Sequence, residues 1–514
     1  MTHPATARSP RRPAVPPAFH VPASAAHRWN LRSLPPGPGH DGTVYVADRL
    51  LLAGGPPEEG SRQLSELHQL AQESAVELSV ASLGTPHRGR ASERVTEALR
   101  AGEQSVVELH PSGPEAPDAW GLLSRARAAG LEMAPRLALD HVLMAAGPIS
   151  GVGYVSGVGY VSGVGYVSGV GYVSGVAGSG PGSPADRIPV AWPGSVPRDP
   201  DAGWAPTVAI LDTGLGTHPW FEENVTRDPQ LDGRAIGLRF PADQDPEVGG
   251  ITLDPINGHL DPMAGHGTFI AGIVRAACPG AHIVSVPVMY GDGACDEADL
   301  IAALTDLHTR HLLSLDGQLD EPPLDILNLS LGYYHESPDT VSDETGLMAA
   351  LTALSDAGVT VVASAGNGGS DVRFWPAAAG SAGSMGAAGA GAPLLSVGST
   401  NAGGQKVSHF SNTGSWVRTY RPGAGVVSTM PTTLDGAAQA SQLGTGAGHP
   451  RRGTPDLDDF SGGFGLWSGT SFSAPRLVGE LAHALAAQAR PDDQEARIAL
   501  ARSMADRICA EGVP

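Results

Sequence analysis

Apolar residues in the second half of the chain alternate between two kinds of run. Short runs rich in β-branched residues predict buried strands, at 207–212, 281–287, 324–331 and 359–363. Longer segments with apolar residues at helical spacing predict helices, at 298–313, 346–357 and 476–489. Such alternation is typical of an α/β fold with a doubly wound, mostly parallel sheet, in which functional side chains gather where strands end and helices begin.

Residues 43–147 show a different order of runs. The pattern predicts strands at 44–52, 76–83, 105–110 and 134–144, and helices at 61–75 and 116–129. A β-α-β-β-α-β succession of about 100 residues is typical of a small α+β ferredoxin-like domain. We therefore expect such a domain ahead of an α/β domain at 204–514.

A short perfect repeat separates these two regions. The sequence Gly151-Val-Gly-Tyr-Val-Ser156 occurs four times in succession. A repeat this short cannot bury a core, so residues 148–203 are expected to form a mobile linker. Residues 1–42, rich in proline and arginine, are expected to form a disordered tail.

Charge and hydrophobicity exclude some classes of partner. The 514 residues carry a formal net charge of −21, which argues against nucleic acid because phosphate contacts need clustered Lys and Arg. No run of about 18 apolar residues occurs, so we expect no contact with a membrane. Pro13, Pro16 and Pro17 interrupt the apolar stretch that a secretory signal requires, which favours a cytoplasmic location.

The chain has three cysteines. Cys278, Cys295 and Cys509 are too few for a disulfide framework, although Cys278 and Cys295 could meet in space. None has the spacing of a metal site, so all three are expected to be unpaired structural thiols.

Three polar residues stand where predicted elements begin or end. Asp212 ends a strand in Leu-Asp-Thr-Gly, His266 opens a helix in Gly-His-Gly-Thr, and Ser471 precedes a helix in Gly-Thr-Ser-Phe-Ser-Ala-Pro. Taken singly, each has a commoner structural role: the aspartate as a turn residue or cap, the histidine as a solvated or capping imidazole, the serine as a helix N-cap.

Taken together and in this order, the three motifs resemble those of the subtilisin-like serine proteases (subtilases). The separations of 54 and 205 residues are compatible with that family, and the resemblance covers about residues 204–489. It implies that Ser471 is the nucleophile, that His266 is the general base and then the general acid, and that Asp212 orients the imidazole.

The resemblance also implies an oxyanion hole. Asn367, in Ala-Gly-Asn-Gly after the strand predicted at 359–363, matches the family's oxyanion asparagine, and the backbone N–H of Ser471 would be the second donor. An asparagine between glycines would otherwise be a turn residue that tolerates positive φ.

A peptide substrate would lie as an extended strand between two backbone segments. The matching segments are Ser330-Leu331-Gly332 and Ala365-Gly366. The chain departs from the family's common form at Phe472 and at Arg476, where a smaller residue and a histidine are frequent. Neither position is expected to take part in the chemistry, although Phe472 could alter local packing.

The N-terminal domain has a proposed role by the same resemblance. Many subtilases carry a prodomain that assists folding and inhibits the site, so residues 43–147 are expected to be an intramolecular inhibitor, with 134–146 close to the active site. The alternative is an unrelated α+β domain that recognises a partner. Self-cleavage is hypothesised to occur in the repeat linker.

Calcium sites are frequent in this family. Asp456, Asp458 and Asp459 form an acidic cluster ahead of the serine motif, but they fit no defined calcium-loop pattern. A solvated acidic loop is the favoured interpretation, so no metal or cofactor is assigned.

Three functions remain open. The favoured one is a serine endopeptidase acting on protein or peptide substrates through an acyl-enzyme. The second is a catalytically silent module that keeps the groove for peptide binding. The third passes the acyl group to an amine and is a peptide ligase or cyclase.

Overall fold

The computed structural model describes residues 21–37, 42–145, 187–198, 204–338, 346–380, 391–440, 442–443 and 452–510, apart from positions 59, 86, 88, 90, 193, 196 and 492. The repeat at 151–176 and the hypothesised self-cleavage in it lie outside the described residues. Of the linker expected at 148–203, residues 187–198 are described, and Ile188–Pro189 form a short strand that pairs antiparallel with Gly465 and Leu466, so this part is not a free tether. No helix of the described chain is long and apolar enough to cross a bilayer.

A seven-stranded sheet forms the centre of the C-terminal domain, in the order β17-β16-β15-β13-β7-β11-β8. The strands are β7 (Thr207–Asp212), β8 (Val225–Thr226), β11 (His282–Pro287), β13 (Ile326–Leu329), β15 (Thr360–Ser364), β16 (Leu394–Thr400) and β17 (Thr419–Pro422). Every neighbouring pair in this sheet is parallel. The predicted doubly wound, mostly parallel α/β sheet is therefore confirmed.

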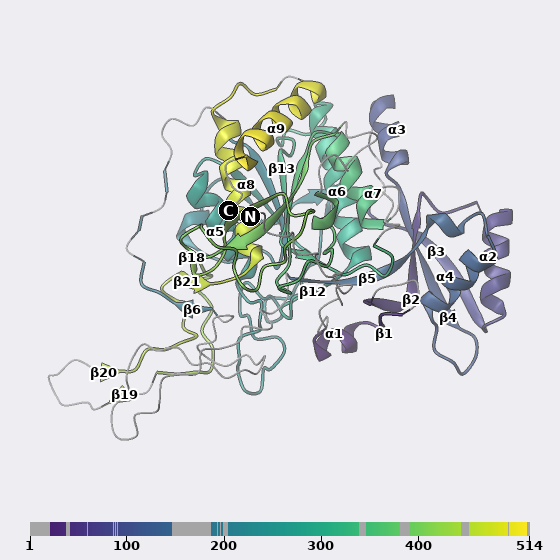
Figure 1. Ribbon diagram of the computed structural model, residues 1–514, viewed down its shortest axis with the longest axis horizontal. Helices are drawn as coiled ribbons and strands as arrows, with labels where there is room; N and C mark the ends of the chain where they lie inside the picture. The colour runs from purple at the N-terminus through teal and green to yellow at the C-terminus, as the bar shows by residue number, and fades with distance from the viewer. Residues whose placement is uncertain are drawn as a thin grey trace, which may run out of the picture.

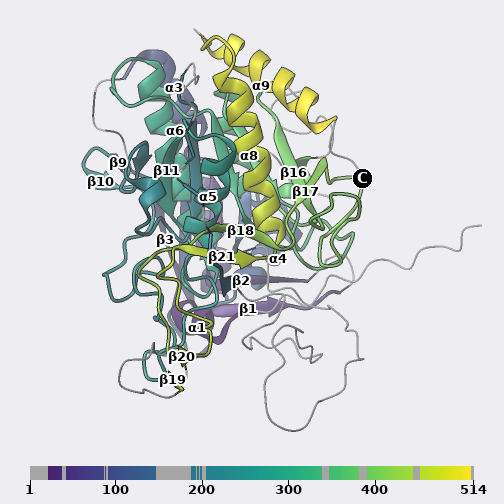
Figure 2. The same ribbon diagram turned by 90° about the vertical axis from the view of Figure 1, so that its left-hand side faces the viewer.

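Helices cover both faces of this sheet (Figure 1). One face carries α5 (His266–Ala277), α8 (Thr470–Ala486) and α9 (Gln494–Cys509), and the other carries α6 (Glu297–Leu315) and α7 (Gly346–Asp356). Figure 2, which views the molecule from the side of α8 and α9, shows both helices lying over the sheet. Because both faces are buried, the strands are continuous apolar runs.

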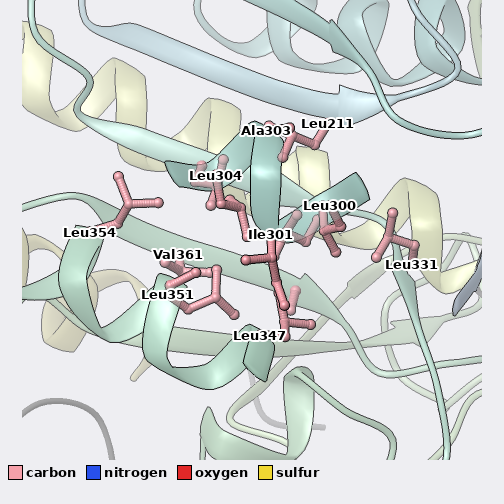
Figure 3. Close-up of a cluster of buried hydrophobic side chains, with 14 of the residues drawn as sticks. Leu211, Leu300, Ile301, Ala303, Leu304, Leu331, Leu347, Leu351, Leu354 and Val361 are labelled. Atoms are coloured by element: carbon pink, nitrogen blue, oxygen red, sulfur yellow. The ribbon is translucent and has the colours of Figure 1, made fainter. Parts of the chain in front are cut away.

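Strand β7 shows how the two faces divide the core. Val208 and Ile210 belong to the buried cluster of α5 and α8, whereas Ala209 and Leu211 belong to that of α6 and α7. Figure 3 shows the latter cluster, with leucines from α6 and α7 against the sheet. Each fully buried leucine stabilises the fold by roughly 1.5–3 kcal/mol, so packing on both faces holds β7 in the centre of the core.

The N-terminal domain is an antiparallel sheet in the order β5-β2-β4-β3, with α2 and α4 packed on it. Its elements are β2 (Thr43–Ala53), α2 (Arg62–Gln72), β3 (Val76–Ser82), α3 (Glu93–Ala101), β4 (Gln104–Pro111), α4 (Ala119–Ala128) and β5 (Leu137–Ala145). This is the predicted β-α-β-β-α-β order with one addition. Helix α3, which the sequence pattern did not predict, lies against α6 of the other domain.

The expectation of a disordered tail up to residue 42 is wrong for residues 21–37. Helix α1 (Ala23–Arg28) is followed by β1 (Leu31–Leu34), which pairs antiparallel with β2. Arg28 forms an ion pair with Asp292 of the C-terminal domain. A few apolar residues between the prolines suffice here, because they extend an existing sheet and add to an existing core.

The end of β5 lies between two segments of the C-terminal domain. Met144 pairs with Ala294 of β12 (Ala294–Asp296) on one side and with Gly332 of β14 (Leu331–Gly332) on the other, both antiparallel. The two domains therefore share one seven-stranded sheet.

The remaining strands of the described chain are short. They are β6 (Ile188–Pro189), β9 (Gln230–Leu231), β10 (Arg234–Ala235), β18 (Val426–Thr429), β19 (Gln442–Leu443), β20 (Arg452–Gly453) and β21 (Phe464–Trp467). Strands β18, β21 and β6 form a small antiparallel sheet. It lies at the edge of the molecule on the side of α5 and α8 (Figure 1).

Candidate active site

Asp212 and His266 form a buried pair. Asp212 is the last residue of β7 and His266 is the first of α5, and Oδ1 of the aspartate lies 2.7 Å from Nδ1 of the histidine. The backbone N–H of Thr213 also donates to this oxygen, at 2.8 Å. Their relative exposures are 0% and 2%, so the pair is shielded from bulk water.

Two glycines beside His266 let the start of α5 come this close to β7. A Cβ atom on Gly267 would lie 2.1 Å from the carbonyl oxygen of Gly214, a distance at which no side chain fits. Gly265 has a φ of 81°, which L-residues with a Cβ rarely adopt. The motif Gly-His-Gly is thus required by the approach of helix to turn.

Glu247 joins the two segments that carry this pair, and no motif or periodic pattern pointed to it. Its carboxylate accepts hydrogen bonds from the Thr213 hydroxyl at 2.5 Å, the Gly267 N–H at 3.0 Å and the Thr268 hydroxyl at 2.5 Å. Burial raises the pKa of Glu247 to about 8, against the opposing effect of the two threonines. Glu247 therefore holds the turn after Asp212 against the first turn of α5.

Ser471 is the second residue of α8 and is buried. Its hydroxyl donates to the carbonyl oxygen of Ser330 at 3.3 Å, and within the described chain it makes no hydrogen bond to His266. The His266 ring lies against the ring of Phe472, with centroids 5.4 Å apart. His266 thus contacts the residue that follows Ser471, but the hydrogen bond between histidine and serine is not formed. Such bonds are often loose without substrate.

The proline of the serine motif has a visible consequence. Pro475 lies inside α8 and lacks an N–H, so the carbonyl of Ser471, four residues earlier, receives no helical hydrogen bond from it. The hydroxyl of Ser330 donates to that carbonyl instead, at 3.0 Å. Asn328 in turn donates to the Ser330 hydroxyl at 3.1 Å. Ser330, the first residue of the expected substrate segment, is therefore hydrogen-bonded to the serine turn.

Asn367 lies beside the serine turn as well. Its side-chain oxygen accepts from both the backbone N–H and the hydroxyl of Thr470, each at 2.9 Å. Its Nδ2 atom lies 3.4 Å from the position that a Cβ of Gly469 would take. The amide is thus fixed next to Ser471, with its oxygen turned to Thr470.

The two expected substrate segments differ in the structure. Leu331 and Gly332 pair with β5, as a bound peptide strand would. The carbonyl oxygens of Ala365 and Gly366 instead accept hydrogen bonds from Asn412, at 2.8 and 2.9 Å, and neither residue pairs with β5.

The second wall of the groove is a segment that the sequence analysis missed. It consists of β12 and Gly293, whose carbonyl oxygen accepts from the N–H of Ala145 at 2.8 Å. A strand of three residues is too short to show a periodic pattern. Its pairing partner lies about 150 residues away, so no local signal indicates the pairing either.

Aromatic residues enclose the imidazole. Trp467 meets the His266 ring edge to face with centroids 5.4 Å apart, and Phe472 packs on Phe269 at 4.5 Å. The larger residue at Phe472 thus fills the space beside His266. Arg476 points to Glu480 at 3.8 Å on the exposed side of α8.

The acidic cluster near the serine motif is held by backbone amides. Oxygen atoms of Asp435, Asp456 and Asp458 come within 4.8 Å of one another. Asp458 accepts from the N–H of Ala438 at 3.1 Å, and Asp456 accepts from the N–H of Ala440 at 3.0 Å. Asp459 caps its own turn in the same way, at Ser461. These bonds connect the cluster to the backbone of its own loop.

The three cysteines are buried and form no disulfide among the described residues. Cys278 and Cys509 lie in the cluster of α5, α8 and α9, and Cys295 lies in that of α6 and α7.

Comparison with known proteins gives a consistent result. A family model described as "Subtilase family" matches residues 203–509. Subtilisin-like protease 3 of Trichophyton tonsurans is 28% identical over 258 residues, which are 49% of this chain and 53% of that protein. Subtilisin BL of Lederbergia lenta is 27% identical over 252 residues, covering 47% of this chain and 71% of that one. The chain thus spans about half the length of the Trichophyton protein.

Solved structures are more distant. Fervidolysin from Fervidobacterium pennivorans, described as a keratinolytic enzyme related to subtilisin, has 16% sequence identity and a TM-score of 0.45, with 88% of this chain and 55% of that chain covered. A cold-adapted subtilisin-like serine proteinase has 21% identity and a TM-score of 0.35, with 58% and 83% covered.

Proposed function

This chain belongs to the subtilase family, and from that membership we propose that it is a serine endopeptidase that hydrolyses protein or peptide substrates. The observation that carries the proposal is the buried hydrogen bond of 2.7 Å between Asp212 and His266, at a strand end and a helix start beside Ser471. Burying a carboxylate with an imidazole costs free energy, which a proton-transfer site explains.

In the proposed reaction the Ser471 hydroxyl attacks the substrate carbonyl carbon. Nε2 of His266 takes the hydroxyl proton, and Asp212 stabilises the imidazolium that results. The tetrahedral intermediate collapses as His266 gives its proton to the leaving amine, which leaves an acyl-enzyme on Ser471. Water then attacks the ester, with His266 again as the base, and releases the acid product.

We propose that Asn367 donates from its side-chain NH₂ group to the oxyanion. The support is the orientation of the amide, whose oxygen is occupied by Thr470 while Nδ2 lies at the serine turn. The backbone N–H of Ser471 at the start of α8 is the proposed second donor, and a helix N-terminus favours developing negative charge.

The N-terminal domain is proposed to be an intramolecular inhibitor. Its strand β5 occupies the position between β12 and β14 in which a peptide substrate would lie, with backbone pairing on both sides. A peptide bound by strand addition competes directly with β5 for those hydrogen bonds. The expected approach of residues 134–146 to the site is supported by this pairing up to Ala145.

The test measures whether Ser471 is an activated nucleophile. Intact mass would be recorded for the wild type and Ser471→Ala, before and after exposure to a fluorophosphonate probe. We expect one adduct on the wild type and none on the variant, with loss of the N-terminal mass only in the wild type. Failure to label the wild type, even after limited proteolysis has opened the groove, would favour a silent peptide-binding module.

The ligase or cyclase differs only in what attacks the acyl-enzyme. Product masses separate the two reactions, because hydrolysis adds one water across the cleaved bond and transfer to an amine does not. Products joined through new amide bonds would replace the endopeptidase assignment.

A further inference from the structure

A buried pair of carboxylates lies where β5 enters the groove. Glu297 opens α6, and Glu336 follows β14 by four residues. His141 of β5 lies between them, with Nδ1 at 2.5 Å from Glu297 and Nε2 at 2.8 Å from Glu336. All three side chains are at most 2% exposed.

The C-terminal domain holds this pocket in shape by itself. The second oxygen of Glu297 accepts from the N–H of Leu347 at the start of α7, at 2.9 Å. The ring of Tyr333 is stacked on His141, with centroids 4.4 Å apart, and His335 lies on the same side at 5.0 Å. The N-terminal domain contributes the imidazole of His141 and its backbone N–H, which donates to Glu297 at 3.3 Å.

Two buried carboxylates require a cation between them. Ionised groups taken out of water cost several kcal/mol each unless they are paired, as a general rule. Burial lowers the pKa of His141, but Glu297 and Glu336 outweigh burial and raise it to about 10. Burial alone would raise the pKa of Glu336, yet His335 and His141 lower it to about 2. Each ring nitrogen of His141 thus faces a carboxylate oxygen, which is the arrangement of an imidazolium between two acids.

A metal ion explains the same residues less well. Ligand atoms of His141, His335 and Glu336 do lie within 4.8 Å of one another. However, both ring nitrogens of His141 already face carboxylates, and Nδ1 of His335 accepts from the backbone N–H of Ser337 at 2.9 Å. The proton carried by His141 satisfies both acids without a metal.

Charge complementarity extends along the same contact. Nη2 of Arg49 in β2 lies 2.6 Å from Oδ2 of Asp296 in β12, and Nη2 of Arg28 lies 3.1 Å from Oδ2 of Asp292. At both points the cation belongs to the N-terminal part and pairs with an acid of the C-terminal domain, as at His141. Arg49 also pairs with Asp140 of its own domain, with Nε 3.2 Å from Oδ2.

We propose that Glu297 and Glu336 form a cation-binding subsite at the end of the peptide groove, specific for a protonated basic side chain on the strand that lies there. In this structure the occupant is His141, which lies four residues before Ala145 along β5. A substrate that replaces β5 would place a histidine, lysine or arginine at the corresponding position. The assignment to substrates rests on the proposed endopeptidase, whereas the assignment to β5 does not.

The first experiment uses the full chain carrying Ser471→Ala, so that proteolysis plays no part. Hydrogen exchange of the amides at 142–145 would be measured with His141→Gln, Glu336→Gln and both together. We expect each single variant to lower protection at least tenfold. The double variant should lose much less than the product of the two, because it removes both members of the His141–Glu336 pair and leaves only Glu297 without its cation, as His141→Gln already does.

The matched control is His110→Gln, since His110 is an exposed histidine of the same domain beside Glu108. It should leave protection unchanged. A thermal melt identifies variants that fail to fold, and for these the reciprocal Glu297→Gln supplies a second cycle with His141. Additive losses would overturn the subsite, and so would loss of protection on adding a chelator to the unsubstituted Ser471→Ala chain.

The second experiment tests the substrate class with active enzyme. Peptides released from a mixed protein digest would be sequenced, and we expect basic residues to be enriched at one fixed position on the amino-terminal side of the cut. This enrichment should vanish in the double variant Glu297→Gln with Glu336→Gln. Cleavage without enrichment overturns the subsite, whereas absence of cleavage together with a positive exchange cycle overturns the endopeptidase and leaves the subsite for β5.

Discussion

Among the described residues, His266 and His141 are buried histidines that face carboxylates, and they differ in the use of the second ring nitrogen. His266 binds Asp212 through Nδ1, and its other nitrogen makes no hydrogen bond within the described chain. His141 binds a glutamate through each nitrogen. Burial and the carboxylate partner are common to both pairs.

A histidine–carboxylate pair can therefore serve two different functions. An imidazole with one nitrogen held and one open can take and return a proton, which is what general base catalysis requires. An imidazole held at both nitrogens keeps its proton, because releasing it would leave two buried acids without a cation. Whether the second ring nitrogen has a carboxylate partner thus decides whether the histidine acts as a general base or as a structural ion pair between the domains.

The largest effect expected separates the two histidines directly. His266→Ala should lower kcat by on the order of a millionfold, as loss of the base does in a serine-protease triad, and Asp212→Asn by about ten-thousandfold. His141→Gln should instead leave kcat per active site unchanged and speed the labelling of Ser471. The measurement is peptide turnover normalised by active-site titration. Similar losses of kcat in His266→Ala and His141→Gln would contradict the different roles assigned to the two histidines.

The next effect concerns the oxyanion side of the first site. Asn367→Ala should lower kcat roughly 100- to 1,000-fold, with little change in KM, because the lost donor acts mainly on the transition state. Asn257→Ala is the control, since Asn257 lies in an exposed turn and donates only to Asp254. Equal effects of the two substitutions would contradict the role of Asn367.

The contact of His141 with Glu297 and Glu336 should weaken in the alkaline range. His141 has a pKa of about 10 in place of 6.5, so the contacts of its charged form are complete below pH 6.5 and are lost as the pH rises toward 10. We expect exchange protection at 142–145 in the Ser471→Ala chain to fall by up to about tenfold per pH unit above pH 7.

Other titrating groups around His141 define the control for this experiment. Burial lowers the pKa of His335 to about 4 and raises the pKa of Tyr333 well above its usual value. Both side chains therefore stay neutral between pH 7 and 9.5. Burial also raises the pKa of Asp140 and, to about 7, that of Asp299, so their ionisation acts in the same direction. In His141→Gln the decline above pH 8 should disappear, and its persistence would assign the effect to the aspartates.

The smallest effect expected concerns Glu247. Its pKa of about 8 lies above the ordinary 4.5, so the folded state holds its proton more tightly and stability declines as the pH rises from 4.5 through 8. Glu247→Gln keeps the acceptor oxygen and should reduce kcat only a few-fold. It should also flatten the fall of the Tm of the Ser471→Ala chain across that range. Glu222→Gln, an exposed position, should change neither, and a Tm profile unaltered by Glu247→Gln would refute the assignment.

The sequence predicted the elements and residues whose cause is local. The apolar run of β7 and the glycines around His266 follow from burial and close approach within a few residues. The residues of the second histidine cluster could not be predicted. His141 meets partners 156 and 195 residues away, and no periodic pattern connects positions so far apart.

The structure of short segments could not be predicted from the sequence for a related reason. Strand β12 has three residues, too few to show a period, and becomes a strand only because β5 lies beside it. Residues 21–37 have the composition of a disordered tail, yet β1 is ordered by pairing with β2. Glu247 stands in a loop, and its partners Thr213 and Gly267 are adjacent to it only after β7 and α5 have come together.

The sheet shared by the two domains has a consequence for solubility. While β5 is in place, it protects the backbone groups of β12 and β14 from other chains. Removing the N-terminal domain would leave both as open strand edges facing each other across the groove, a template for any extended chain. The N-terminal domain then also guards against aggregation, and a processed enzyme should show concentration-dependent self-association that an added peptide strand suppresses.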